Sequence, residues 1–353
     1  MRSLFLFAFG VFWAVANTLT AADRTYTLPC EIGSFSPSGD GTTVWIGCFE
    51  LPAPPGKASP EFAYQRNSVA YALDTASGRL TEIVRSTGMI FVAAAPAGAK
   101  AVLWLTAANT DNAATVYERS RKIAKLSAEV LDPSWTPDAK KLVFLTSLPG
   151  DQSPLPKLLG TVNVDGSAIS KVKLAMPSEL LFSCRQNGHL FTGDIAVGRS
   201  GHLKVAGADE YGPDLRYLGR NAKTPPGDFS ATCRYVATPS SFHGPVPWEI
   251  VDTATGRQLM YSDFTGEGKN TEYQFVAWNP RREGIFLRRV HLPGDPRDEK
   301  SALQIFDLRS GGVVESIAST VGATLSPEAQ WSPDGNWLML ARGQSLTLHA
   351  APN

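Results

Sequence analysis

A short turn-forming pattern recurs along this chain: an aromatic residue, then Ser, Thr or Asn followed by Pro-Asp-Gly or part of it, then an apolar run. Its complete form is Trp331-Ser332-Pro333-Asp334-Gly335. Pro fixes φ, Asp accepts hydrogen bonds from the nearby backbone and Gly adopts a positive φ, so the pattern predicts a tight turn between two strands. Repetition of such a unit indicates an all-β array, a β-propeller or a related repeat fold. Partial copies lie at 35–39, 135–138 and 278–280.

Each repeat is predicted to contain four antiparallel strands, with a second turn-rich segment before the last strand. These second turns lie at 74–78, 165–166, 252–256 and 307–311. Two units, 87–128 and 175–222, keep the alternation of strands and turns but lack the Pro-Asp-Gly sequence. We therefore predict a seven-bladed β-propeller, with six or eight blades as alternatives. The predicted units are 30–86, 87–128, 129–174, 175–222, 223–270, 271–320 and 321–353.

The last unit is one strand short, because the chain ends after its third predicted strand. The segment Arg24-Thr25-Tyr26-Thr27-Leu28 alternates as a strand does and belongs to no unit of its own. We predict that it forms the outer strand of the last blade. Such closure joins the two ends of the chain and removes a free sheet edge.

The first 22 residues have the features of a secretory signal: Arg2, an apolar stretch from Leu4 to Ala16, and small residues up to Ala22. We predict cleavage after Ala22, with an uncleaved anchor as the alternative. Residues 23–353 would then form one propeller domain in the periplasm or outside the cell, with no membrane span after signal removal. The chain has 33 basic and 33 acidic residues, a balance that argues against a nucleic-acid partner.

Four cysteines in an exported chain suggest disulfides. If the first turn is centred on Gly39, Cys30 and Cys48 lie opposite each other on paired strands, within bridging distance. Cys184 and Cys233 fall at equivalent turns of consecutive blades, so a bridge between blades is predicted there, with two independent thiols as the alternative. No Cys-x-x-Cys spacing occurs, and we expect no metal site.

The aromatic-Ser-Pro-Asp-Gly turn at 331–335, with second turns of the Asp-x-x-Thr-Gly kind, resembles the WD-repeat-like propellers of the TolB type. That family consists of exported bacterial proteins, and the same repeat occurs in the propeller domains of prolyl-oligopeptidase-like enzymes. The resemblance implies blade construction and export, and it implies little about function. TolB's separate N-terminal α/β domain has no counterpart here, because the first blade begins close to the predicted cleavage site.

The predicted topology places the tight turns on one face and the long connections on the other, which we call the long-loop face. Long loops on a rigid scaffold are where binding residues usually lie. We therefore expect a protein or peptide partner to bind there. The candidate binding residues are Tyr64, Arg66, Asp111, Asp151, His243, Trp248, His291 and Asp295.

The sequence contains no Gly-x-Ser-x-Gly elbow, His-Glu-x-x-His helix, phosphate loop or dinucleotide fingerprint. We accordingly predict an exported scaffold with no catalytic residues and no cofactor. Two alternatives remain. One is a channel enzyme of the hydrolase or lactonase type, using His243, His291, Asp151 or Asp111 with a metal. The other is a sensor of sugars or other small ligands, with Trp248 and Tyr64 as stacking residues.

Overall fold

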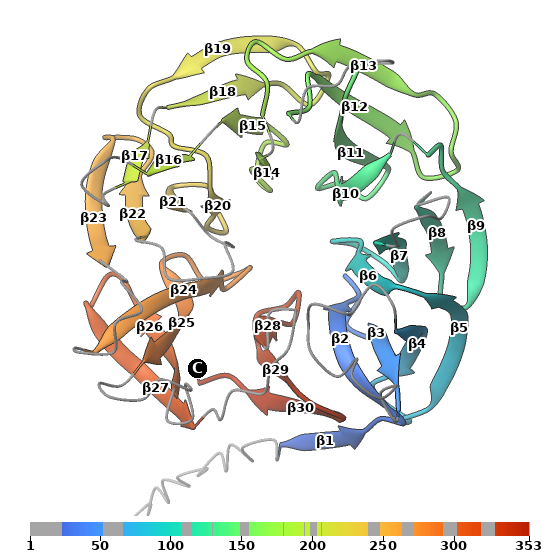
Figure 1. Cartoon of the computed structure of the whole chain (residues 1–353). Coiled ribbons are helices and arrows are strands. Elements are labelled where there is room, and N and C mark those ends of the chain that lie inside the picture. The colour runs from blue at the N-terminus through green and yellow to red at the C-terminus, as the bar shows by residue number, and fades with distance from the viewer. Residues whose placement is uncertain are drawn as a thin grey trace, which may run out of the picture.

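A computed structural model describes most of the chain, and the described part contains strands and no helices. Seven four-stranded antiparallel sheets surround one axis as blades (Figure 1). The prediction of a seven-bladed propeller is confirmed. The described residues are 23–51, 66–106, 114–128, 130–148, 155–178, 180–193, 195–197, 203–205, 207–238, 248–262, 271–291, 302–318 and 329–352.

In every blade the first strand lies nearest the axis and the last lies at the outer rim (Figure 1). Blade 1 contains β2 (Cys30–Pro37), β3 (Thr43–Glu50), β4 (Asn67–Asp74) and β5 (Leu80–Thr87). Blade 2 contains β6 (Met89–Ala94), β7 (Lys100–Thr106), β8 (Thr115–Glu118) and β9 (Arg121–Lys125). Blade 3 contains β10 (Leu131–Trp135), β11 (Lys141–Thr146), β12 (Leu158–Asn163) and β13 (Ser170–Lys173).

The second half of the ring repeats this order. Blade 4 contains β14 (Leu180–Ser183), β15 (Leu190–Gly193), β18 (Ala208–Tyr211) and β19 (Tyr217–Asn221). Blade 5 contains β20 (Asp228–Phe229), β21 (Tyr235–Thr238), β22 (Trp248–Asp252) and β23 (Arg257–Ser262). Blade 6 contains β24 (Glu272–Trp278), β25 (Ile285–His291), β26 (Ala302–Asp307) and β27 (Gly312–Ala318). Blade 7 contains β28 (Ala329–Trp331), β29 (Trp337–Arg342), β30 (Ser345–Ala350) and β1 (Arg24–Thr27).

Blade 4 carries an additional two-stranded hairpin that the sequence analysis did not predict. Its strands, β16 (Ile195–Val197) and β17 (Leu203–Val205), pair with each other and not with the blade. They lie in the chain between the second and third blade strands. The insertion leaves the four-stranded sheet intact.

The N-terminal strand closes the ring, as predicted. β1 pairs antiparallel with β30, with Arg24 opposite Leu348 and Thr27 opposite Ser345. The closure also reaches the first blade, because the hydroxyl of Tyr26 donates a hydrogen bond of 2.7 Å to the carbonyl oxygen of Thr75. The seam between the chain ends is therefore held by backbone pairing within blade 7 and by a side chain that extends to blade 1.

The tryptophans of the repeat pack between neighbouring blades. Trp135, Trp278 and Trp331 are buried, and the indole N–H of each donates to a backbone carbonyl on the inner strand of the preceding blade. The acceptors are Ala93 and Asp228, both at 2.8 Å, and Ala277 at 3.4 Å. A buried indole therefore fills the space between sheets and also satisfies its own polar atom, which explains its place in the repeat.

Both predicted cysteine pairs are bridged. Cys30 and Cys48 join the first two strands of blade 1, and Cys184 and Cys233 join the first turns of blades 4 and 5. The Cα atoms are 5.6 Å apart in each pair, the usual separation for a disulfide. Two disulfides are consistent with an oxidising, exported location. The described part of the chain has no helix able to span a membrane.

The strand register around the first bridge differs from the prediction. Cys30 lies opposite Glu50, and Cys48 lies opposite Ile32, so the bridge runs diagonally between the strands. A bulge between Ile32 and Ser34 shifts the pairing further.

The cause of this difference is the position of the turn in blade 1. The residues that perform the role of Ser332-Pro333-Asp334-Gly335 are Ser38-Gly39-Asp40-Gly41, and Gly41 has the positive φ of 71°. The predicted alignment of 36–39 with the repeat was thus wrong by two residues.

Candidate functional site

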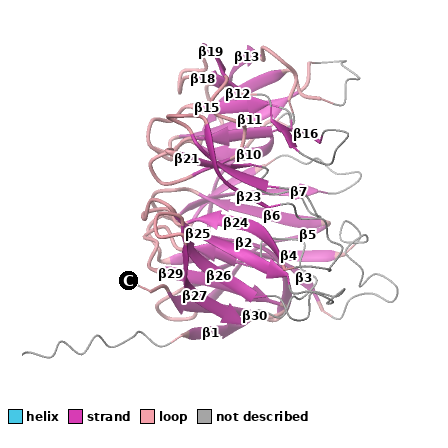
Figure 2. Ribbon diagram, turned by 90° about the vertical axis from the view of Figure 1, so that its left-hand side faces the viewer, coloured by secondary structure: helices cyan, strands magenta, loops and turns pink. Residues whose placement is uncertain are grey.

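The topology gives the ring two unlike faces. Turns between the first and second strands, and between the third and fourth, lie on one face, which we call the tight-turn face. Connections between the second and third strands leave from the opposite, long-loop face. Figure 2 shows the described turns gathered at one end of the strands, together with the C-terminus.

Carboxylates on the tight-turn face are used to build turns. The hydroxyl of Thr136 donates to Asp138 at 2.7 Å, and that of Ser167 donates to Asp165 at 2.6 Å. In each case this side-chain hydrogen bond is the main reason that the pKa of the Asp carboxyl lies below its usual range. A carboxylate stabilised as an anion by its own turn is a poor proton donor or acceptor near neutral pH. These residues are structural.

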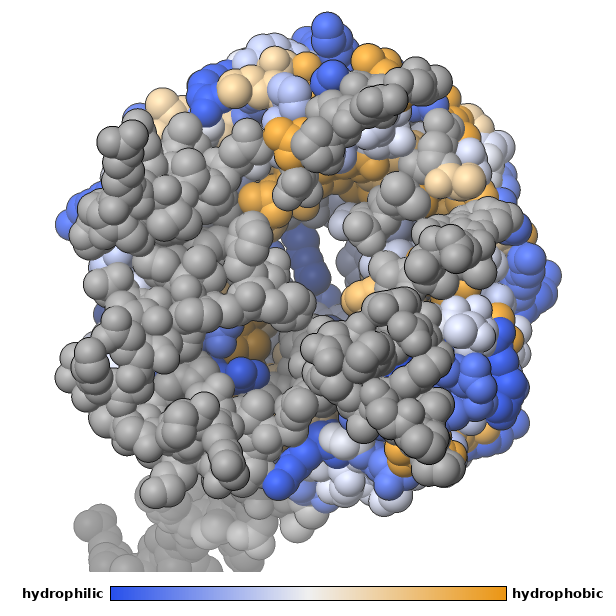
Figure 3. Space-filling model, in the orientation of Figure 1, coloured by the Kyte–Doolittle hydropathy of each residue, from blue (hydrophilic) through white to orange (hydrophobic). Residues whose placement is uncertain are grey.

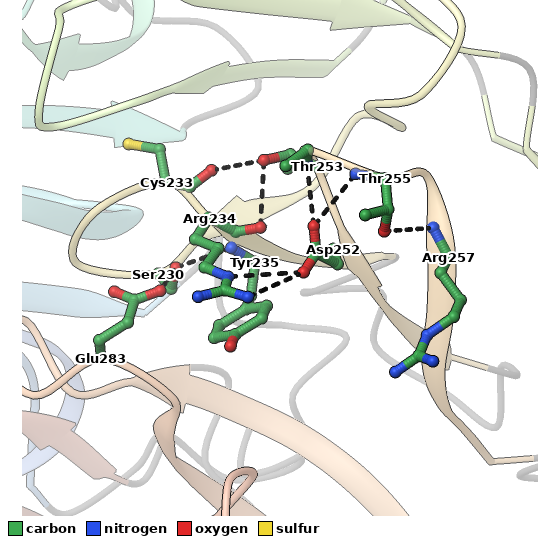
Figure 4. Close-up of polar contacts among 10 residues, drawn as sticks. Ser230, Cys233, Arg234, Tyr235, Asp252, Thr253, Thr255, Arg257 and Glu283 are labelled. Atoms are coloured by element: carbon green, nitrogen blue, oxygen red, sulfur yellow. Dashed lines mark hydrogen bonds and ion pairs between the residues drawn. The ribbon is translucent and has the colours of Figure 1, made fainter.

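Blade 5 shows how such turns connect along the ring (Figure 4). Asp252 accepts hydrogen bonds from the backbone N–H groups of Ala254 and Thr255 and lies 3.4 Å from Nε of Arg234. Glu283, in the turn of blade 6, accepts from the hydroxyl of Ser230 at 2.5 Å. Polar groups of neighbouring turns therefore satisfy one another across the boundary between blades.

Of the eight residues proposed from the sequence, the structure describes the position of three, and these lie at the long-loop ends of their strands. Arg66 directly precedes β4, and Trp248 is the first residue of β22. His291 is the last residue of β25, and its side chain is outside the described part. The other five also lie outside the described residues: Tyr64, Asp111, Asp151, His243 and Asp295.

Arg66 and Trp248 contribute to packing in this structure. Arg66 is 3% exposed, lies 2.8 Å from Glu31 and stacks over the ring of Phe49 at 4.4 Å. Trp248 is 2% exposed and its indole N–H donates to the carbonyl oxygen of Tyr273. Neither side chain is therefore available at the surface for stacking or ion pairing with a partner.

The ring remains open along its axis (Figure 3). A cavity of about 320 Å³ lies beside this channel, bordered by the inner strands of blades 3 to 6 and by the first turns of blades 4, 5 and 6. Because those turns belong to the tight-turn face, the cavity lies toward that end of the channel. The apolar part of its lining includes Leu181, Phe182, Phe229, Val276 and Trp278.

Arg185 is the charged residue that the first turn of blade 4 contributes to this lining. Its side chain is exposed to solvent although protein surrounds the cavity on several sides. Loss of hydration is the main reason that the pKa of Arg185 is lowered; the charge of Asp228 opposes this shift and that of Arg281 adds to it. Arginine remains protonated at neutral pH even so. The cavity lining thus contains a solvent-exposed cation.

Asn279, another polar residue of the lining, and its neighbour Arg281, which lies outside the lining, are held by the backbone of the repeat. Asn279 is completely buried; its Oδ1 accepts from the backbone N–H groups of Arg281 and Arg282, and its Nδ2 donates to the carbonyl oxygen of Gly335 at 3.0 Å. Nε of Arg281 donates to the carbonyl oxygen of Pro333 at 3.2 Å. The turn of blade 6 is therefore tied to that of blade 7, which fixes the position of the Arg281 charge.

Sequence reasoning did not identify this cavity. Its lining comes from separate segments of four consecutive blades, between Ser134 and Pro280, and no local motif joins these segments. One signal was present, because the turn Arg185-Gln186-Asn187-Gly188 contains a positively charged residue where the usual Pro-Asp-Gly turn has none. Among the described residues, no group of three or more His, Cys, Asp or Glu side chains is placed to hold a metal ion.

The fold and the channel cavity define the class of this protein as a seven-bladed β-propeller with a solvent-accessible axial channel. No protein-family model matches the chain, and no curated protein matches it in sequence.

Proposed function

We propose that this protein is an exported, non-catalytic propeller of the TolB-like kind, which binds a protein or peptide partner on its long-loop face. The observation that carries the proposal is the difference between the two faces. On the tight-turn face, polar side chains such as Asp138, Asp252 and Glu283 are engaged in hydrogen bonds within and between turns. The connections that hold most of the candidate residues leave from the opposite face.

The construction of the ring supports a binding role. The chain ends pair through β1 and β30, and one disulfide joins blades 4 and 5. A rigid frame reduces the ordering cost that binding must overcome, so loops mounted on it can achieve affinity with few contacts. The proposal places the protein in the periplasm or outside the cell after removal of residues 1–22, where the disulfides persist.

A selection from a random peptide library displayed on phage tests this proposal, with the oxidised protein beginning at Asp23 as the target. Selected peptides are synthesised and their affinities measured by fluorescence anisotropy. We expect Tyr64→Ala, His243→Ala or Asp295→Ala to weaken at least one peptide about 10-fold or more, the loss typical of a binding hot spot. Lys140→Ala, which removes an exposed side chain from the tight-turn face, is the control and should change affinity less than about 2-fold.

Two results would overturn the proposal. One is a set of peptides whose affinities are unchanged by all three long-loop substitutions. The other is weakening by Lys140→Ala alone, because the partner surface would then be the tight-turn face.

A further inference from the structure

We propose that the tight-turn end of the central channel binds a carboxylate group, and that Arg185 is the residue that holds it. This site is separate from the long-loop face and goes beyond the function proposed above. It consists of the cavity of about 320 Å³, the cation that lines it, and an apolar wall. Cavities of this size are typical of sites for small ligands.

The guanidinium of Arg185 makes no hydrogen bond or ion pair with any residue in the described part of the chain. Two other arginines, by contrast, are engaged: Arg288 donates two hydrogen bonds to Gln304, and Arg66 pairs with Glu31. The N–H donors of Arg185, a residue of the cavity lining, are therefore not used by the described part of the protein. The planar fork of an arginine matches the two oxygens of a carboxylate in a bidentate pair.

The charges around the cavity favour an anion. Arg185 and Asp228 both line the cavity, and Arg281, which lies outside the lining, is close enough to Arg185 for the two positive charges to repel. These three side chains together carry a net positive charge. A carboxylate bound to Arg185 would balance this net charge.

The apolar part of the cavity lining indicates which group should be attached to the carboxylate. Leu181, Phe182, Phe229 and Val276 give the cavity an apolar surface beside the cation. An apolar body gains free energy by leaving water, so the preferred ligand is a carboxylate attached to a short aliphatic or aromatic group. Free organic acids carry such a group, and so does the C-terminus of a peptide that ends in an apolar residue.

Matched acids and amides test this proposal in calorimetric titrations of the oxidised protein beginning at Asp23. Phenylacetate represents free acids and N-acetylphenylalanine represents a peptide C-terminus, each compared with its neutral amide. We expect at least one acid to bind with a Kd of about 1 mM or tighter, and its amide to bind about 10-fold more weakly or not at all. The acid that binds identifies the source of the carboxylate, and either one supports the proposal.

Substitutions locate the site. Arg185→Gln should weaken the acid about 10-fold or more, and Arg185→Lys should give an intermediate loss because it keeps the charge without the fork. Arg281→Gln should weaken binding about 3-fold through the loss of a nearby charge. Arg216→Gln is the control, since this exposed arginine on the same face is absent from the cavity lining. The proposal is overturned if neither acid shows saturable binding, if acid and amide bind equally, or if Arg185→Gln leaves the affinity unchanged.

Discussion

His349 and Glu315 connect the last blade to the blade before it: Nε2 of His349, on β30, lies 2.9 Å from Oε1 of Glu315, on β27. The other ring nitrogen, Nδ1, lies 3.1 Å from a carboxylate oxygen of Asp23, at the start of the N-terminal strand segment. Burial disfavours the charged imidazole, but the hydrogen bonds to Asp23 and Glu315 outweigh it, so the pKa of His349 is raised. One imidazole therefore links three segments at the seam that closes the ring.

This contact makes the stability of the ring depend on pH. Because the pKa of His349 is raised in the folded state, its contribution is fully present below its ordinary pKa of about 6.5 and is lost as the pH rises through the higher folded value. We expect the melting temperature of the wild type to exceed that of His349→Gln by more at pH about 5.5 than at pH about 8.5. Thermal unfolding of both proteins across this range measures the difference. A difference that is constant with pH would contradict the assignment, and Glu315→Gln should reduce the pH dependence.

The two disulfides should contribute unequally to stability. The Cys184–Cys233 bridge joins residues 49 apart in the chain, and the Cys30–Cys48 bridge joins residues 18 apart. Closing a longer loop restricts the unfolded chain more, which corresponds to about 4 kcal/mol for the first bridge and about 3 kcal/mol for the second.

Urea denaturation of the two double variants, Cys184→Ala with Cys233→Ala and Cys30→Ala with Cys48→Ala, checks this order. The free energy of unfolding should fall further for the bridge between blades. The reverse order would show that local packing around Cys30 and Cys48, both of them nearly completely buried, outweighs loop length.

The sequence predicted the fold well because the turn chemistry of the repeat is local. Asp334 and Asp138 accept hydrogen bonds from the hydroxyl group two residues earlier, and these contacts can be anticipated from spacing alone. The same reasoning placed the first turn of blade 1 wrongly, because residues 36–39 also resemble the repeat. The turn instead uses Ser38, which donates to Asp40 at 2.6 Å. Two turn-like sequences overlap in this segment with an offset of two residues, and turn propensity alone does not decide which of them forms the turn.

The functional candidates were harder to predict, because their surroundings depend on residues far away in the chain. Arg66 was proposed as a loop residue, and only the fold shows that Glu31, 35 residues earlier, lies beside it. Trp248 starts a strand and points into a cluster with Phe286, although its type and position also suited a surface site. Arg185 was not proposed from the sequence, because its turn lacks the Pro-Asp-Gly sequence of the repeat. The cavity that it lines forms only when four blades are assembled.

Gly335 should be more sensitive to substitution than Gly311, although both have a positive φ near 70°. A Cβ atom at Gly335 would lie 2.4 Å from Oδ1 of Asn279, whereas nothing lies within 4 Å of one at Gly311. Asn279 is completely buried and hydrogen-bonded, so it has little freedom to move aside.

Gly311→Ala should cost about 1 kcal/mol from backbone strain alone, and Gly335→Ala about 2 to 4 kcal/mol because overpacking is added. Chemical denaturation of the two variants measures both losses. Equal losses would mean that the Asn279 side chain relaxes freely, and would weaken the view that it ties blade 6 to blade 7.

The hydrogen bond from Trp278 to Asp228 provides a test of how neighbouring blades are joined. In Trp278→Phe the carbonyl oxygen of Asp228 loses the indole donor that lies 2.8 Å away. A partly unsatisfied carbonyl and the loss of ring volume should together lower the free energy of unfolding by about 2 to 4 kcal/mol.

Trp331→Phe is the matched comparison, because that ring is similarly buried but its N–H lies 3.4 Å from the carbonyl oxygen of Ala277. We expect Trp331→Phe to lose about 1 kcal/mol less of the free energy of unfolding than Trp278→Phe, as measured by urea denaturation, because the hydrogen bond that it removes is weaker. Equal losses of unfolding free energy would instead show that the repeated aromatic residue stabilises the protein through the packing of its ring alone.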